Sequence, residues 1–170
     1  MINMKFELKK WEEKYIKDVA KHGNNEKIAS KLRDVFPYPY TYEDAEWYVR
    51  DCIMNEGGNN ITRAIVVNGE AVGSIGVFVM DDVYRKSAEI GYWLSEDYWG
   101  KGIMSEAVGI ITKQAFDKFD IVRIHAEIFS NNQGSKRVLE KAGFKFEGRK
   151  EKSVYKNGEV LDSLVYAYIK

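Results

Sequence analysis

The sequence has very little of the residue types that mark disulfide-stabilised, cysteine-ligated or disordered chains. Cys52 is the only cysteine among 170 residues, so neither an internal disulfide nor a pair of cysteine metal ligands can form. Only two prolines occur, and 45% of the residues are hydrophobic while 31% are charged. This composition excludes a disordered or fibrous chain and favours a globular one. We expect no bound metal.

Net charge and long apolar runs are also missing. The 26 basic and 26 acidic residues cancel, so charge provides no reason to expect nucleic acid or an anionic membrane as the main partner. No stretch reaches the roughly 18 apolar residues of a spanning helix, and residues 1–7 show no apolar signal core. We therefore expect a cytoplasmic protein with no nucleic acid or membrane partner, built as one domain over residues 1–170.

What the sequence does contain is a clear alternation of strand and helix periodicities. Two Asn-Gly dipeptides, Asn68-Gly69 and Asn157-Gly158, each predict a two-residue hairpin turn between antiparallel strands. Thr41, with Asp44 three residues later, predicts the start of a helix. The pattern predicts an α+β, three-layer fold: a mixed, largely antiparallel sheet of about seven strands with helices on both faces. The expected strands are 5–9, 61–67, 71–80, 85–94, 121–129, 144–155 and 159–169, and the expected helices are 11–21, 41–55, 103–118 and 133–142.

Two junctions between a strand and a helix carry the chemistry. At the first, Gly100 and Gly102 open an amphipathic helix, so several backbone N–H groups are left without partners and can bind an anion. The loop is not a Walker motif, and Ser105 stands where a dinucleotide fingerprint has glycine. The alternative is a tight turn that needs glycine only for its backbone geometry. The second junction runs through Asn132 into the helix 133–142.

Three segments together resemble the GNAT superfamily of acetyl-CoA-dependent N-acetyltransferases, and most of all its branch of ribosomal-protein N-terminal alanine and serine acetyltransferases. They are residues 89–94 (Glu-Ile-Gly-Tyr-Trp-Leu), residues 98–107 and residues 132–144. The aromatic segment 36–41 and the terminal hairpin fit the same branch, so the resemblance covers nearly the whole chain. It implies acetyl-CoA as cosubstrate and a GNAT-like sheet.

The resemblance also implies a set of coenzyme-binding residues. The family loop Gln/Arg-x-x-Gly-x-Gly/Ala falls on residues 99–104, with Trp99 in its polar position and Met104 in its small-residue position. Main-chain groups of 92–94 are expected to pair with the pantetheine arm, and the Asn132 side chain to reach it. The implied coenzyme-binding residues are Tyr92, Trp93, Leu94, Trp99, Gly100, Lys101, Gly102, Ile103, Met104, Ser105 and Asn132. The structural alternatives are core packing for residues 92–94, a helix cap for Asn132 and a solvated side chain for Lys101.

Amine acetylation requires a path for the amine's proton and a proton for the leaving thiolate. The candidates for these roles are Glu89 and Glu127 as bases and Ser135 as proton donor. Leu139 stands where the family's frequent tyrosine acid is found. The structural alternative for both carboxylates is an ion pair, for example with Arg85 or Arg123. His125 is expected to be a hydrogen-bonded bystander, and His22 to lie at the surface.

The sequence thus predicts direct transfer of acetyl from acetyl-CoA to a primary amine, either a protein N-terminus or a small molecule. Related proteins imply that aromatic residues line the acceptor side, namely Phe36, Tyr38, Tyr40 and Tyr42. The alternative function is a non-catalytic acyl-CoA-binding sensor or interaction module, which the substitutions at Met104 and Leu139 keep open. A homodimer through the last strands is compatible with the pattern.

Overall fold

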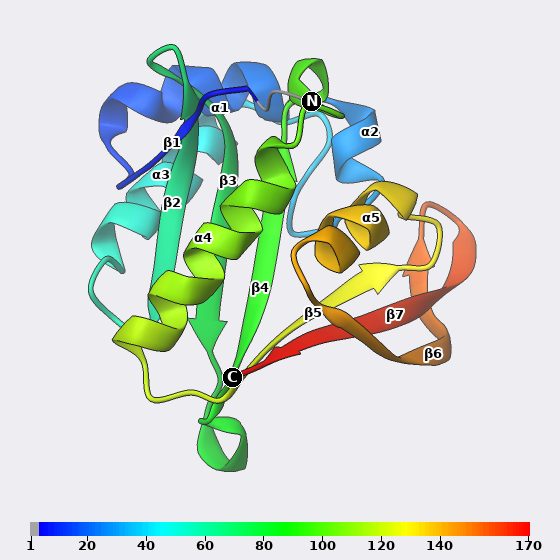
Figure 1. The fold of residues 1–170 in the computed structure, drawn as a ribbon. Coiled ribbons are helices and arrows are strands. Elements are labelled where there is room, and N and C mark those ends of the chain that lie inside the picture. The colour runs from blue at the N-terminus through cyan, green and yellow to red at the C-terminus, as the bar shows by residue number, and fades with distance from the viewer. Residues whose placement is uncertain (1–3) are drawn as a thin grey trace.

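The computed structural model describes residues 4–170; Met1, Ile2 and Asn3, the start of the N-terminus expected to lack an export signal, lie outside the described residues. The strands form one seven-stranded sheet in the order β1-β2-β3-β4-β5-β7-β6 (Figure 1). The strands are β1 Glu7–Lys9, β2 Asn60–Val67, β3 Glu70–Val79, β4 Ser87–Leu94, β5 Arg123–Phe129, β6 Lys145–Lys156 and β7 Glu159–Ile169. The helices are α1 Ile16–Gly23, α2 Glu26–Ala29, α3 Tyr42–Met54, α4 Ile103–Lys118 and α5 Gln133–Lys141, with 3₁₀ turns at Glu13–Tyr15, Asp82–Tyr84 and Glu96–Tyr98.

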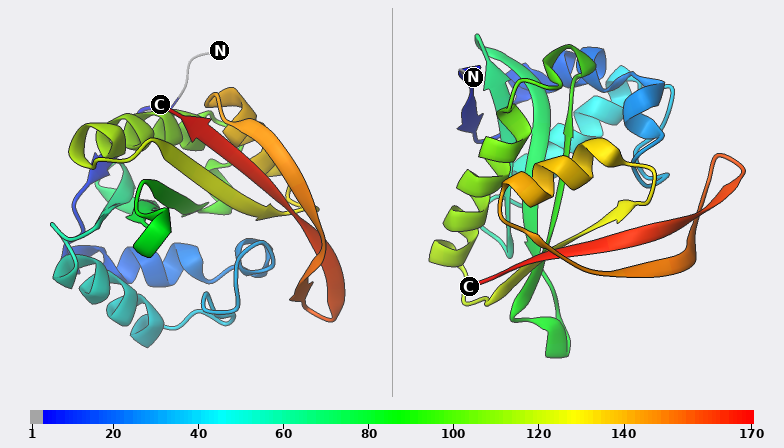
Figure 2. Two further views of the ribbon diagram at one scale, coloured as in Figure 1. Left: turned by 90° about the horizontal axis from the view of Figure 1, so that it is seen from below. Right: turned by 45° about the vertical axis from the view of Figure 1, so that its right-hand side comes forward.

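Within this sheet β4 and β5 form the one parallel pair, and their pairing is short. It joins residues 87–89 to residues 123–125 and ends at the pair Glu89 and His125. Beyond that pair the two strands diverge, while β3 follows β4 and β7 follows β5 to their ends (Figures 1 and 2). We call the end of the pairing, at Glu89 and His125, the fork.

Helices cover both faces of the sheet. Alternating side chains of each strand enter two hydrophobic clusters, as the period of two requires. One cluster packs under α4 and α5 and includes Ile90 and Leu94, whereas the other packs under α1 and α3 and includes Trp93. Figure 2 shows the two groups of helices on opposite sides of the sheet. Glu89 alternates with Ile90, so its side chain shares the α1–α3 side of β4 with Trp93.

The predicted fold is confirmed, and most predicted elements lie within two residues of their observed bounds. Both Asn-Gly turns have the left-handed backbone of a type I′ turn, with φ of 50° and 81° at Asn68 and Gly69. The first helix differs from the prediction: it begins as a 3₁₀ turn, and α1 starts only at Ile16. The short helix α2 was not predicted. Asn25 caps it by accepting a hydrogen bond from the Lys27 N–H at 2.9 Å.

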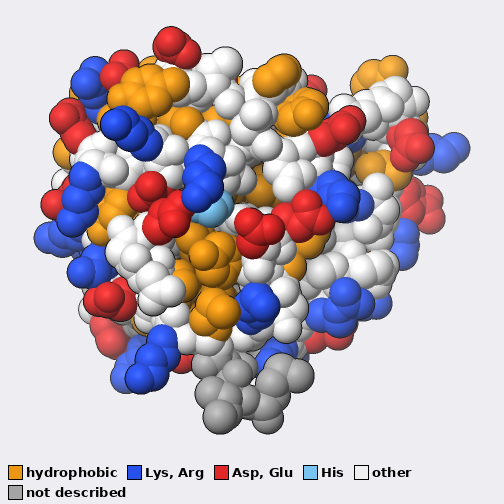
Figure 3. Space-filling view, turned by 90° about the horizontal axis from the view of Figure 1, so that it is seen from above, with side chains coloured by type: hydrophobic (Ala, Val, Ile, Leu, Met, Phe, Trp, Pro, Cys, Tyr) orange, Lys and Arg blue, Asp and Glu red, His pale blue; other side chains and the backbone are white. Residues whose placement is uncertain are grey.

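Charged side chains of both signs are interspersed with apolar ones on the face that Figure 3 shows, in keeping with the balanced composition. Among residues 4–170, no helix has both the length and the apolar character needed to cross a membrane.

The predicted helix start at Thr41 is a complete capping box. The Thr41 hydroxyl accepts from the Asp44 N–H at 3.2 Å, and the Asp44 carboxylate accepts from the Thr41 N–H at 2.9 Å. We expect Thr41→Ala to lower the free energy of unfolding by about 1 kcal/mol, because an orphan N–H of α3 loses its acceptor. Urea denaturation measures the loss. Thr41→Ser retains the oxygen and is the control; an equal loss in both variants would contradict the capping role.

Candidate functional site

The main chain of β4 beyond the fork has one paired and one open edge. The hydrogen bonds from Ser95 N to Val72 O and from Met80 N to Ser87 O set the phase of the β3–β4 ladder. Because an antiparallel ladder alternates, the main-chain groups of residues 89, 91 and 93 point to β3, and those of residues 92 and 94 point to the other side. That is the side from which β5 has diverged. Of the predicted pantetheine-binding residues, Tyr92 and Leu94 therefore present main-chain groups on the open edge, and Trp93 does not.

Trp99 returns to this open edge from the loop before α4. Its indole Nε1 donates a hydrogen bond to the Leu94 carbonyl at 2.8 Å, while its ring stays 44% exposed. The bond satisfies one of the open main-chain groups of β4 and fixes the loop beside the strand end. A polar residue in the family's loop position is thus replaced here by an indole with its own donor.

The loop from Gly100 to Ser105 leaves a run of N–H groups free. Gly100 and Gly102 adopt left-handed backbone, with φ of 72° and 80°, which favours glycine. Within residues 4–170, no backbone acceptor pairs with the N–H groups of residues 100–105, and the 16-residue helix α4 begins at Ile103. The helix dipole adds partial positive charge at the same place. The Met104 side chain is buried in the core under α4, and the Lys101 side chain is exposed.

The second junction brings Ser135 close to β4. Asn132 caps α5, its Oδ1 accepting from the Ser135 N–H at 3.1 Å, so the helix-cap alternative for Asn132 holds. Burial raises the pKa of Tyr92 to about 12, and the Ser135 hydroxyl opposes that rise. Within the described residues, the Tyr92 hydroxyl makes no hydrogen bond of good geometry. Leu139 is fully buried in the core, and it has no group that can donate a proton.

Glu89 stands at the fork in an ionic cluster. Its carboxylate oxygens lie 3.1 and 3.3 Å from the Arg33 Nη2, and one lies 3.5 Å from the His125 Nε2. The His125 imidazole and then the Arg33 guanidinium hold the pKa of the Glu89 carboxyl below its ordinary value, against the effect of partial burial. The predicted partners Arg85 and Arg123 were wrong. Arg85 donates to the Asp82 carbonyl, and Arg123 pairs with Glu147.

Arg33 was missed because no local pattern marks it. It lies 56 residues before Glu89, in the loop after α2, and only the tertiary fold brings the two together. His125 was expected as a bystander; its side chain is 14% exposed, and its Nδ1 is buried without a partner among residues 4–170.

Glu127 lies on β5 beyond the fork, but its oxygens are occupied. One accepts from the Ser163 hydroxyl at 2.8 Å and the other from the Lys150 Nζ at 3.1 Å. Both partners belong to the β6–β7 hairpin. The ion-pair alternative for Glu127 therefore holds, with Lys150 in place of Arg85 or Arg123.

His22 was predicted at the surface, and this prediction was wrong. The residue is 7% exposed; its Nδ1 lies 2.9 Å from the Ser95 hydroxyl, and its Nε2 lies 2.7 Å from the Glu70 carboxylate. The bond to Ser95 joins α1 to the residue that follows β4, at the start of the segment that leads to the glycine loop.

The aromatic loop before α3 divides into core and surface. The Tyr40 ring is 6% exposed and stacks on Phe36 at 4.7 Å between ring centroids, and Phe36 packs on Trp93 at 5.7 Å. Tyr38 and Tyr42 are exposed. Of the four aromatics expected on the acceptor side, Tyr40 is therefore part of the core under β4.

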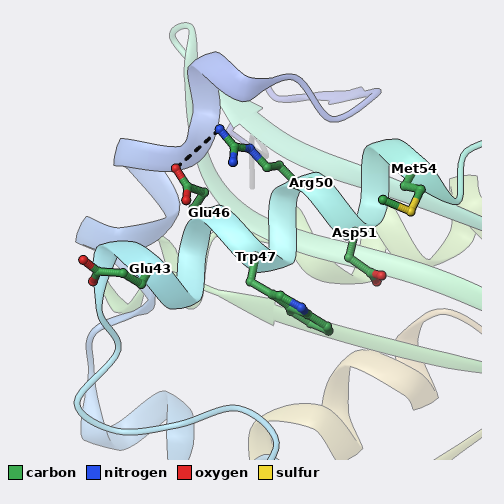
Figure 4. A pocket seen from close by; sticks show the side chains of 6 residues that line it. All are labelled: Glu43, Glu46, Trp47, Arg50, Asp51 and Met54. Carbon is green, nitrogen blue, oxygen red and sulfur yellow. Dashed lines mark ion pairs between the residues drawn. The ribbon is translucent and has the colours of Figure 1, made fainter.

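A shallow hollow on the outer side of α3 is a separate surface (Figure 4). Its lining comes from α3 alone and includes the exposed Trp47 and the Glu46–Arg50 ion pair, whose closest atoms are 3.5 Å apart. None of the residues of the fork contributes to it. In the described part of the chain, no cluster of three or more histidine, cysteine or acidic side chains is arranged to hold a metal ion.

Comparison with known proteins identifies relatives in bacteria. The uncharacterised N-acetyltransferase YoaA of Bacillus subtilis is 35% identical over 101 residues, which cover 59% of this chain and 56% of YoaA. The putative ribosomal N-acetyltransferase YdaF of the same organism is 33% identical over 112 residues, covering 66% and 61%. The solved structure of RimL, a ribosomal L7/L12 alpha-N-protein acetyltransferase in complex with coenzyme A, is 25% identical, with a TM-score of 0.86 over 99% of this chain and 96% of RimL.

The curated relatives extend beyond the matched region, since the match spans only 56% of YoaA and 61% of YdaF. The family model described as an acetyltransferase (GNAT) domain matches residues 5–145 of this chain. That span includes the diverging strands, the glycine loop and both helix junctions. This protein belongs to the acetyltransferase (GNAT) domain family.

Proposed function

We propose that this protein transfers an acetyl group from acetyl-CoA directly to a primary amine. One observation carries the proposal: the open main-chain edge of β4 connects the free N–H groups at the start of α4 to the carboxylate of Glu89 at the fork. A carboxylate and an extended edge of peptide groups thus follow one another along β4, and an anion site follows in the loop that leads into α4. Acetyl-CoA carries complementary groups in the matching order: its pyrophosphate would meet the N–H groups, its two amides would meet the peptide edge, and its thioester would lie near the carboxylate.

In this proposal the N–H groups of residues 100–105 bind the pyrophosphate, as the start of a helix binds phosphate in general. The main-chain groups of Tyr92 and Leu94 then pair with the amides of the pantetheine arm, in the place where a neighbouring strand would pair. Asn132 keeps its side-chain oxygen on the Ser135 N–H, which leaves its amide N–H₂ for the arm.

Glu89 is the better candidate for handling the amine's proton. It stands at the fork, where its closest partner is the exposed Arg33, whereas Glu127 accepts from the buried Ser163 and from Lys150. A carboxyl with a lowered pKa is a weak direct base, so we propose that Glu89 attracts the ammonium and passes its proton to water. The neutral nitrogen then attacks the thioester carbon, the C–S bond breaks, and the leaving thiolate takes a proton. The nitrogen gives its second proton to water as the amide forms.

Ser135 is the proposed donor of the proton to the thiolate. Its hydroxyl lies at the start of α5 near the buried Tyr92 phenol, which its raised pKa keeps protonated at neutral pH. Leu139 cannot serve, because it has no exchangeable proton. The lack of that tyrosine is also the observation that favours the second candidate function, an acyl-CoA-binding module without turnover.

The acceptor that we propose first is the N-terminal amine of a protein. The support is similarity to relatives named as ribosomal N-acetyltransferases, YdaF and RimL. An α-amino group also loses its proton more readily than a lysine side chain, with a pKa of about 8 against about 10.4. Small-molecule amines remain the alternative acceptors, and a homodimer remains a prediction.

We expect Gly102→Val to weaken acetyl-CoA binding at least tenfold, because a branched side chain cannot keep the left-handed backbone that aims the N–H groups. Loss of one charge-assisted hydrogen bond costs about 1.5 to 3 kcal/mol. Isothermal calorimetry measures the affinity, and circular dichroism checks the fold. Gly109→Ala is the control, since Gly109 lies in open space within α4. A wild-type protein that fails to bind acetyl-CoA would overturn the proposed function.

Turnover should depend on Glu89 far more than on Glu127. We expect Glu89→Gln to lower kcat by about 10²- to 10⁴-fold, the usual contribution of proton transfer by a positioned side chain. Glu127→Gln, which removes only a contact to the hairpin, should change kcat less than tenfold. The kcat of each variant is measured by the release of the coenzyme A thiol, with a peptide that begins with serine, spermidine and glucosamine as acceptors. Tight coenzyme binding without turnover on any amine would instead favour the sensor.

The lowered pKa of Glu89 makes a prediction about stability and pH. Because the carboxyl titrates at lower pH in the folded than in the unfolded protein, the unfolded state binds more protons between the two values. The stabilisation is complete above the ordinary value of 4.5 and is lost as the pH falls through the folded value. The stability difference between wild type and Glu89→Gln should therefore shrink below pH 4.5, as measured by urea denaturation. Glu151→Gln, on the exposed part of β6, controls for loss of a carboxylate; a pH-independent difference at Glu89 would contradict the assignment.

A further inference from the structure

Three residues of the loop after α2 attach it across the proposed acceptor side. Lys31 donates to the Asn131 carbonyl at 3.1 Å, and Arg33 pairs with Glu89. Asp34 accepts from the Lys156 Nζ at 2.8 Å. We call residues 31–34 the strap. Its three contacts reach the junction before α5, the fork and the β6–β7 hairpin, so the strap spans the elements around Glu89.

The central contact of the strap is the one that involves the proposed catalytic carboxylate. Arg33 places one cationic nitrogen within 3.3 Å of both carboxylate oxygens of Glu89. His125, a residue of β5, is the second partner of the carboxylate, with its Nε2 3.5 Å from one oxygen. An acceptor ammonium that approaches Glu89 therefore meets a guanidinium already in contact with both oxygens.

The ion pair between Arg33 and Glu89 is exposed enough for another cation to replace Arg33, and it contributes little to the stability of the fold. The Arg33 side chain is 66% exposed and that of Glu89 is 33% exposed. Exposed ion pairs contribute about 0 to 1 kcal/mol, because water screens the charges and two long side chains must be ordered. Arginine is always protonated, so the Arg33 guanidinium keeps its positive charge at every working pH.

We propose that the Arg33 guanidinium holds the place of the acceptor's ammonium on Glu89 in the free protein, and that the acceptor displaces it when it binds. Arg33 is then a specificity-determining residue: it favours acceptors whose amine is cationic and accessible enough to compete with a guanidinium. The inference rests on the proposed function, since it assigns Glu89 to the amine.

Displacement also explains how a carboxylate with a lowered pKa can serve the reaction. While Arg33 is in place, its charge helps to keep the proton off Glu89. When an ammonium takes that position, its own proton faces the carboxylate and the neighbouring water. That proton leaves through water, and the nitrogen's freed electron pair forms the bond to the acetyl carbon as the C–S bond breaks. The leaving thiolate takes a proton, and the nitrogen gives its second proton to water as the amide forms. Arg33 itself forms and breaks no covalent bond.

The test uses a small cation that does not depend on knowing the acceptor. Protein labelled with ¹³C at the glutamate carboxyl is titrated with propylammonium at pH 7, and Glu89→Gln assigns the Glu89 resonance. We expect propylammonium to shift that resonance and to bind about two- to fivefold more tightly to Arg33→Ala than to wild type, the range that exposed pairs contribute. Arg33→Lys, which keeps a cation, should lie between them.

Lys27→Ala is the matched control. Lys27 is also an exposed cation, in α2, but it pairs with Glu96 at 2.8 Å and not with Glu89. It should leave the propylammonium affinity unchanged. Equal or weaker binding of propylammonium to Arg33→Ala overturns the proposal, since Arg33 would then support the acceptor site or lie apart from it. Acetyl-CoA calorimetry on the same variants tests the proposed function separately, because the propylammonium titration needs no coenzyme.

Discussion

The site depends on the fact that β4 and β5 pair over only three residues each and then separate. Each strand remains fully paired on its other side, β4 with β3 and β5 with β7, so the divergence costs only the hydrogen bonds between these two strands. Buried main-chain groups without partners cost about 1 to 3 kcal/mol each, so an open edge in the middle of a sheet needs compensation. Trp99 supplies part of it at Leu94. A ligand with amide groups can pair with the remaining open main-chain groups of β4, so the cost of leaving them unpaired is recovered when such a ligand binds.

The fork also decides where charge can be placed. Glu89 and His125 are register partners in the last parallel pair, so both side chains emerge side by side where the strands separate. The Glu89 carboxylate there pairs with the exposed Arg33, whereas Glu127 farther along β5 accepts from the buried Ser163 and from Lys150, both on the hairpin. The two glutamates that the sequence offered as bases therefore have different sets of partners.

Much of the fold, including the glycine loop before α4, was predictable because the determinants are local. The Asn-Gly turns, the Thr41 capping box and the glycines before α4 each act within a few residues, and all four formed as expected. The partners of Glu89 were not predictable in the same way. Arg33 is 56 residues away and reaches Glu89 only through the packing of the loop after α2. The burial of His22 against Ser95 and Glu70 was not predicted either, because both partners lie far from His22 in the sequence.

The amino-acid sequence by itself determined the order of strands and helices, the hairpins and the glycine loop before α4, because backbone conformation and hydrophobic periodicity are properties of short segments. Only the tertiary structure decided which main-chain groups of β4 stay open and which partners each of the two glutamates has. Those outcomes depend on sheet register and on the divergence of two strands. Such contacts join residues far apart in the chain, and no local pattern encodes them.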